Sequence, residues 1–244
     1  MEEVTTLADG LVLHPLDNHL WNALNGAWAG YSRAVGRIRL LSPDIARVVA
    51  LEAVSPANLS TLAWAMAVGE EILVIAPQVL QSTAELEVQS VKPVLQMVAD
   101  GPIPAAPDIA TFRLSVADFP QMLALVDVAR PGPLGPRALE LGNFRGIFDG
   151  AKLVALAGER LRFDRYTEVA TVCTHPDYRG RGYARAVVSA VMQEIVDAGR
   201  TPFLGVDDGN IAAIRLYEAL GFTHRSTFYL SLVKRTGEAG QADR

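Results

Sequence analysis

One short stretch of the chain, THPDYRGRGYARAVV from Thr174 to Val188, places two glycines among three arginines. Gly180 and Gly182 carry no side chain, so the backbone amides beside them can approach a ligand closely. The Ala and Val that follow predict a helix whose first N–H groups lack intrahelical partners and carry partial positive charge. A loop and helix start of this kind binds phosphate or pyrophosphate. An RNA-binding patch and a plain tight turn are the alternative interpretations.

Two common phosphate-binding patterns do not match this stretch. In the Rossmann pattern G-x-G-x-x-G, Arg185 stands where the third glycine would be. The Walker A pattern needs Gly-Lys followed by Ser or Thr, which is absent here. RNA binding fits poorly, because the net charge is −5 and this Arg-Gly pair is isolated from other basic clusters. A pyrophosphate-binding turn is therefore the favoured interpretation.

The flanking segments predict the elements that such a site needs. YTEVATVCTH (166–175), rich in Val and Thr, predicts a strand, and the apolar spacing after it predicts a helix over about 182–197. Antiparallel hairpins followed by βαβ units indicate a mixed α/β sheet with helices on its faces. The other elements expected in this half are a strand over 110–116, a helix opened by a Ser115/Asp118 capping box, a short helix after Pro136, a hairpin through Asp149-Gly150, a strand over 201–207, a helix capped by Asn210, and a strand over 226–234.

The first hundred residues show helical and extended patterns without a catalytic constellation. Asp17 is expected to cap a helix whose apolar stripe forms core, and Ser55-Pro56 predicts the start of a helix through Met66. Glu70 to Ala76 predicts a strand. The stripe of the first helix comprises Leu20, Trp21, Leu24, Trp28 and Tyr31.

The segment ADGPIPAAPD, from Ala99 to Asp108, contains three prolines and one glycine and predicts an extended connector. It divides the chain into two parts of plausible domain size. We expect an N-terminal α/β domain over 1–100, a Pro-rich linker over 101–110, a larger domain over 111–236 and a flexible tail over 237–244.

The composition narrows the function classes. Half of the 244 residues are hydrophobic and a fifth are charged, as in a soluble globular protein. The single Cys173 excludes an intrachain disulfide and fits a reducing, cytoplasmic compartment. The four histidines show no metal-ligand spacing, so no metal is expected. No signal peptide or membrane-spanning run is recognisable, and neither nucleic acid nor membrane is an expected partner.

Two motifs on these elements carry a family resemblance. VCTHPDYRGRGYARAVV, followed some 25 residues later by NIAAIRLYEALGF, resembles the core motifs of the GNAT superfamily of acyl-CoA-dependent N-acyltransferases. The resemblance covers about 112–234 and implies a twisted mixed sheet flanked by helices, preceded here by a divergent N-terminal half. The matching residues are Arg179, Gly182 and Ala184 in the first motif, and Asn210, Tyr217, Gly221 and Phe222 in the second.

The resemblance implies that the co-substrate is acetyl-CoA or a related acyl-CoA. The strand backbone at Val172, Cys173 and Thr174 would pair with the pantetheine arm, and the Asn210 amide would contact the same arm. The backbone amides that would hold the pyrophosphate belong to Arg179, Gly180, Arg181, Gly182, Tyr183 and Ala184.

The resemblance also implies a direct attack of the acceptor amine, without an acyl-enzyme. Tyr217 would protonate the leaving thiolate, and Glu168 stands where the family often carries the carboxylate that takes the amine proton. Because an amine with a pKa near 10 is mostly protonated at pH 7, a base helps to generate the nucleophile. Most of the acceleration should come from holding amine and thioester together.

Each of these residues has a plainer interpretation. Glu168 could be a solvated edge-strand charge, and Tyr217 could be core. Glu159, on a neighbouring strand, is a candidate for substrate contact or a surface charge. Cys173 is better explained as a small strand residue than as a nucleophile, since no histidine is placed beside it by sequence. His175 precedes a proline and is expected to be a loop residue.

Two function classes stay open. The first is an N-acetyltransferase acting on a primary amine of a small molecule or peptide, and the second is an acyl-CoA-sensing module that has lost catalysis. The sequence does not name the amine. The N-terminal half is expected to shape either the amine site or a homodimer contact.

Overall fold

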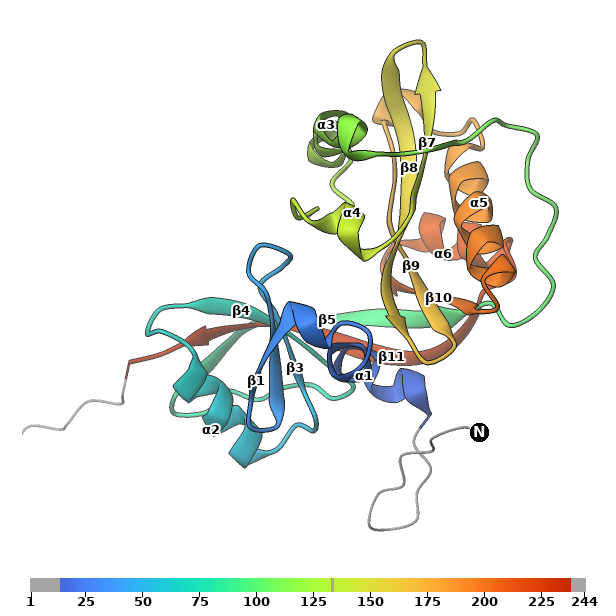
Figure 1. The fold of residues 1–244 in the computed structure, drawn as a ribbon. Helices are drawn as coiled ribbons and strands as arrows, with labels where there is room; N and C mark the ends of the chain where they lie inside the picture. Colours follow the sequence, from blue (N-terminus) through green and yellow to red (C-terminus); the bar gives the residue numbers. More distant parts are fainter. Residues whose placement is uncertain (1–13, 133, 238–244) are drawn as a thin grey trace, which may run out of the picture. The chain divides into compact units, whose positions relative to one another are not determined.

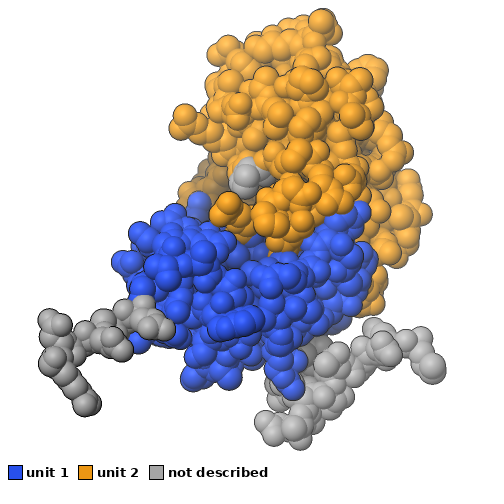
Figure 2. Space-filling model, turned by 60° about the vertical axis from the view of Figure 1, so that its left-hand side comes forward, with its two compact units in different colours: residues 1–40, 48–92, 228–244 blue, residues 41–47, 93–227 orange. Residues whose placement is uncertain are grey.

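The computed structural model describes residues 14–132 and 134–237. It contains two compact units built from segments that are not contiguous in sequence (Figure 2). Unit 1 comprises residues 1–40, 48–92 and 228–244, and unit 2 comprises residues 41–47 and 93–227. The expected mixed α/β fold class is confirmed, whereas the linear domain boundaries drawn from the sequence stay a prediction.

Unit 2 contains the two motifs and is a mixed sheet with helices on both faces (Figure 1). Strands β6 to β9 are antiparallel neighbours, β9 pairs with β10 in parallel, and β10 pairs with β5 in antiparallel fashion. The bounds are β5 (Leu86–Val98), β6 (Phe112–Arg113), α3 (Phe119–Ala129), α4 (Ala138–Leu141), β7 (Phe144–Asp149), β8 (Lys152–Phe163), β9 (Tyr166–Thr174), α5 (Tyr183–Asp197), β10 (Thr201–Asp207) and α6 (Ile211–Glu218).

Each face of the unit 2 sheet has its own apolar core. On one face, Val187, Val188 and Val191 of α5 pack with Val169 of β9 and with residues of α6. On the other face, α3 and α4 cover a second cluster that includes Cys173. Figure 1 shows α3 and α4 on the opposite side of β7 and β8 from α5. The alternation of strand side chains explains how one sheet supplies both cores.

Unit 1 is a smaller α/β arrangement. Its strand β2 pairs with β3 in antiparallel fashion, β3 with β4 in parallel, and β4 with β11 in antiparallel fashion. Leu62, Val74 and Val233 are fully buried in its core. The bounds are α1 (His19–Asn25), β1 (Ser32–Val35), β2 (Ile38–Leu41), β3 (Val48–Leu51), α2 (Pro56–Ala65), β4 (Glu71–Ala76) and β11 (Thr223–Arg235), of which the last runs on from unit 2.

Most elements expected from local signals are confirmed. The Ser55 side chain accepts from the Asn58 amide at the start of α2. The predicted capping box is present, because the Ser115 amide donates to Asp118 at 2.8 Å and Ser115 caps the turn in return. The hairpin between β7 and β8 turns at Gly150, whose φ is +58°, a value that favours glycine.

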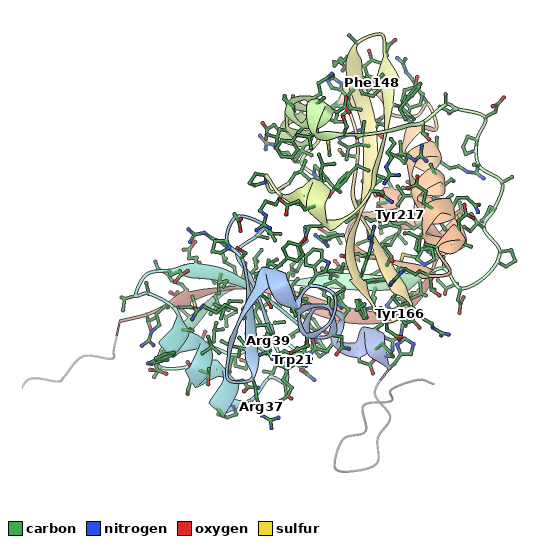
Figure 3. All side chains as sticks on the ribbon, in the orientation of Figure 1. Trp21, Arg37, Arg39, Phe148, Tyr166 and Tyr217 are labelled. Atoms are coloured by element: carbon green, nitrogen blue, oxygen red, sulfur yellow. The ribbon has the colours of Figure 1, made fainter. Side chains whose placement is uncertain are left out.

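The structure differs from the expected elements at four points. Asp17 does not cap α1, because it closes a capping box with His14 at the start of a 3₁₀ turn, Pro15–Asn18. The helix ends at Asn25, where Asn and Gly have low helix propensity, so the aromatic stripe continues into a turn. Trp28 is buried, whereas Trp21 is half-buried beneath the guanidinium of Arg39 at 4.9 Å (Figure 3).

The other two errors concern strands. Only Phe112 and Arg113 of the expected 110–116 strand pair with β7. The thirteen-residue strand β5 was not expected, because Pro93 interrupts its pattern and its first half is polar. Pairing with distant strands, and not local propensity, determines this element.

Candidate functional site

The loop between β9 and α5 presents a row of unpartnered backbone amides. Gly180 and Gly182 have φ angles of +75° and +78°, and Gly182 is the N-cap of α5 without any side-chain cap. The first intrahelical bond runs from the Ala186 amide to the Gly182 carbonyl at 3.1 Å. Within the described residues, the amides of 180–185 donate to no protein acceptor. This geometry fits the predicted pyrophosphate-binding turn. We call the backbone amides of residues 180–185 the amide cradle.

The side chains beside the cradle also leave polar atoms without partners. Thr174 Oγ1, at the end of β9, and Arg185 Nε, in the first turn of α5, are buried and make no hydrogen bond within the described chain. Buried polar groups of this kind are rare unless a ligand or water completes them. A Cβ added at Gly180 would meet nothing within 4 Å, so the approach to the loop is open. The residues present therefore fit a polar, phosphate-bearing ligand.

Tyr178 fastens the cradle to the β7–β8 hairpin. Its hydroxyl donates to Asp149 Oδ2 at 2.7 Å, and this bond, with burial, raises the pKa of Tyr178. Arg181 lies over the Tyr178 ring, 4.8 Å from its centroid. His175 caps the 3₁₀ turn Pro176–Tyr178, because its Nδ1 accepts from the Asp177 amide at 3.3 Å. His175 is thus a loop residue with a structural role, as expected.

Strands β9 and β10 separate beside the cradle. Their parallel pairing ends at Glu168 and Phe203, although β9 continues to Thr174 and β10 to Asp207. Thr171 has a φ of +54°, and the register against β8 shifts at this point, which marks a β-bulge. The backbone of Val172–Thr174 therefore has no β10 neighbour. A bulge and a free strand edge are what the predicted pantetheine contact requires.

The second motif lies on α6. Asn210 caps this helix through its Oδ1, which accepts from the Ala213 amide at 3.2 Å, and its amide nitrogen is left as a donor. Tyr217, labelled in Figure 3, is 7% exposed. Its ring packs edge-on against Phe222, with ring centroids 5.9 Å apart. Burial raises the pKa of Tyr217 to about 12. Its hydroxyl makes no hydrogen bond to any described residue.

Glu168 is a buried carboxylate and not a solvated charge. It is 2% exposed and accepts from one guanidinium at both oxygens, from Arg160 Nε at 2.8 Å and from Arg160 Nη2 at 2.6 Å. Glu159 is also buried, accepting from the Asn143 amide and pairing with Arg162. The surface-charge interpretation is therefore wrong for both glutamates.

Arg160 is a site residue that was not predicted from the sequence. One signal was available, since in a β-hairpin Arg160 and Glu168 fall on the same sheet face. The register of β8 and β9, shifted by the bulge and at the hairpin end, hides this relation from simple counting.

Cys173 is expected to resist thiol reagents at pH 8. Burial raises the pKa of this thiol from 9.0 to about 12, against the opposing effect of a backbone hydrogen bond at Leu156. The folded chain favours the neutral thiol of Cys173. The contribution of this group to the free energy of unfolding is therefore complete below pH 9 and is lost as the pH rises towards 12. The reaction with dithionitrobenzoate should be slow in buffer and fast in guanidinium. Fast labelling of the folded chain would contradict a structural role.

Among the residues that the structure describes, no group of three or more His, Cys, Asp or Glu side chains could hold a metal ion. None of the described helices is long and apolar enough to cross a membrane.

The chain is similar in sequence and fold to known acetyltransferases. The FR47-like protein family model matches residues 144–230, which contain both motifs. Two curated bacterial relatives match over part of the chain. An L-methionine sulfoximine/L-methionine sulfone acetyltransferase of Salmonella typhimurium is 36% identical over 27% of this chain and 40% of its own. A [ribosomal protein bS18]-alanine N-acetyltransferase of Escherichia coli is 34% identical over 36% of this chain and 60% of its own. The chain thus spans less than two thirds of either relative.

A solved structure extends the similarity to nearly the whole chain. It is a putative acetyltransferase from the GNAT family of Novosphingobium aromaticivorans, 35% identical, with a TM-score of 0.85. The match covers 92% of this chain and all of that one. With the cradle, the bulge and both motifs in place, the chain belongs to the GNAT family of acetyltransferases.

Proposed function

We propose that this protein transfers an acetyl group from acetyl-CoA to a primary amine by direct attack in a ternary complex. The observation that carries the proposal is the row of unpartnered amides at residues 180–185, beside the free edge of β9. GNAT acetyltransferases use acetyl-CoA, which would supply an acetyl thioester when bound.

Most of the predicted binding residues have a task in this proposal. The amides from Gly180 to Ala184 would hold the pyrophosphate at the helix N-terminus, whereas the Arg179 amide already donates to the Pro176 carbonyl at 3.3 Å. The backbone of Val172–Thr174 would pair with the pantetheine arm, as a strand would, and the Asn210 amide would donate to the same arm. These contacts would hold the thioester at the place where β9 and β10 separate.

Two side chains would handle protons. Glu168 would receive the amine proton, directly or through a water molecule, because it is a buried carboxylate at the point where β9 and β10 separate. Tyr217 would give its proton to the departing thiolate. Since its pKa is about 12, Tyr217 keeps that proton throughout the neutral range.

The acceptor would be a small molecule or a peptide. One curated relative acts on methionine sulfoximine and methionine sulfone, and another on an alanine of a ribosomal protein. Both acceptors present a primary amine, which supports the proposed reaction type.

The decisive experiment follows free thiol release from acetyl-CoA with a panel of amines. Acetyl-CoA binding and turnover on at least one amine are expected. Failure of a folded protein to bind acetyl-CoA in calorimetry would refute the proposal. Binding without turnover would instead favour the acyl-CoA-sensing alternative.

Tyr217→Phe is expected to lower kcat by about 10- to 100-fold, because the thiolate then leaves without a proton donor. The KM for acetyl-CoA should change little. The raised pKa of Tyr217 further predicts that its ionisation causes no fall in wild-type kcat between pH 7 and 10. Steady-state kinetics over this range checks both statements. Tyr229→Phe, on β11, is the matched control, and an equal loss there would contradict the acid role.

A further inference from the structure

The ion pair between Arg160 and Glu168 is exposed at one end only. The Glu168 side chain is 3% exposed, whereas the Arg160 side chain is 52% exposed. A buried carboxylate thus fixes a guanidinium that opens to solvent. Holding a long side chain in one geometry removes much of the entropy that a ligand contact would otherwise cost.

The donors of Arg160 are only partly used. A guanidinium carries five N–H groups. Glu168 takes the edge formed by Nε and Nη2, at 2.8 and 2.6 Å, and Arg160 makes no other hydrogen bond or ion pair with the described residues. The remaining edge, formed by Nη1 and the second hydrogen of Nη2, is a planar fork. Such a fork matches a carboxylate in two parallel hydrogen bonds.

Arg160 lies where the second substrate would arrive. Glu159 is opposite Val169, which packs against α5, so the adjacent Arg160 and Glu168 project from the other face of the sheet. Glu168 is also the last β9 residue that pairs with β10. The fork therefore stands beside the separation of the strands, on the face opposite the amide cradle.

We propose that the acceptor is a free α-amino acid whose carboxylate binds the outer edge of Arg160. This inference rests on the proposed function. Amine and carboxylate of an α-amino acid share one carbon, so a carboxylate on Arg160 keeps the amine within reach of Glu168, directly or through water. The N-terminus of a peptide carries an amide in place of that carboxylate and lacks the group that the fork binds.

Binding of L-α-amino acids and of their carboxamides, measured by calorimetry in the presence of coenzyme A, tests the proposal without requiring turnover. At least one amino acid should bind about tenfold or more tightly than its carboxamide, in line with a charge-assisted bidentate contact. Arg160→Lys keeps the charge but loses the fork. It should weaken the binding of that amino acid by about tenfold and leave the binding of its carboxamide nearly unchanged.

Arg162→Lys is the matched control, because Arg162 lies on the same strand and pairs with the other buried glutamate. It should leave the ratio of the two affinities unchanged. The double variant Arg160→Gln/Glu168→Gln leaves no buried unpaired charge. It should also abolish the preference for the amino acid over its carboxamide. Equal binding of acid and amide, or an unchanged ratio in Arg160→Lys, overturns the inference. Thiol release with the same amino acids tests the proposed function separately.

Discussion

Replacing Gly182 with proline is expected to abolish acetyl-CoA binding, with at least about a 100-fold loss of affinity, whereas Arg181→Ala should weaken it by no more than about tenfold. Proline fixes φ near about −65° and has no N–H. Gly182 has a φ of +78° and supplies one of the amides of the cradle. Arg181 is an exposed cation over the Tyr178 ring, so its contribution is screened. Calorimetry with acetyl-CoA measures both.

Gly199→Pro is the control for backbone damage. Gly199 follows the other end of α5, has a φ of +72°, and donates its amide to Val196 at 2.8 Å. The strain should be at least as large there, yet the cradle is untouched, so binding should survive in the folded fraction. Equal losses from Gly182→Pro and Arg181→Ala, in folded variants, would show that charge and not the amide row holds the ligand.

A fragment from Ala106 to Arg244 is expected to misfold, although it contains every residue of both motifs. It lacks β5, whose residues Val94 to Val98 pair with Asp207 to Phe203 of β10. Without them β10 becomes a free edge next to the site, and Met97 is lost from the core that holds Tyr217. Solubility and acetyl-CoA binding measure the outcome.

A longer fragment that begins at Leu86 restores the missing strand. It should give a far higher yield of folded protein than the Ala106 fragment. This folded protein should bind acetyl-CoA. As a second control, a protease site placed within 101–108 of the whole chain should allow cleavage without loss of binding, because β5 would be held by its hydrogen bonds. A soluble, fully active Ala106 fragment would prove the strand dispensable.

The amide cradle could be predicted from the sequence, whereas the strand β5 could not. The cradle was predictable because its signals are local, namely positive-φ glycines, a helix start and a strand before them. The cap made by Asn210 and the hairpin at Gly150 were predictable for the same reason. Local chemistry dictates such features within a few residues.

The rest depended on contacts between distant segments. Strand β5 has a weak strand pattern around Pro93, and its pairing with β10 joins segments that lie far apart in the sequence. The burial of Glu168 and its fixation by Arg160 depend on strand register, which shifts between Glu159 and Arg162 near the end of the hairpin. A one-residue shift moves a side chain to the other face of the sheet, so counting along the sequence could not place this pair.

The late partner of β5 has a consequence for synthesis of the chain on a ribosome. Val98 must pair with Phe203, which is translated on the order of ten seconds later. Until then the edge of β5 that pairs with β10 has no partner, and closing so long a loop slows the step that completes the sheet. The coenzyme site can therefore form only after translation has passed β10 and α6. The nascent chain should need protection from aggregation for most of its elongation.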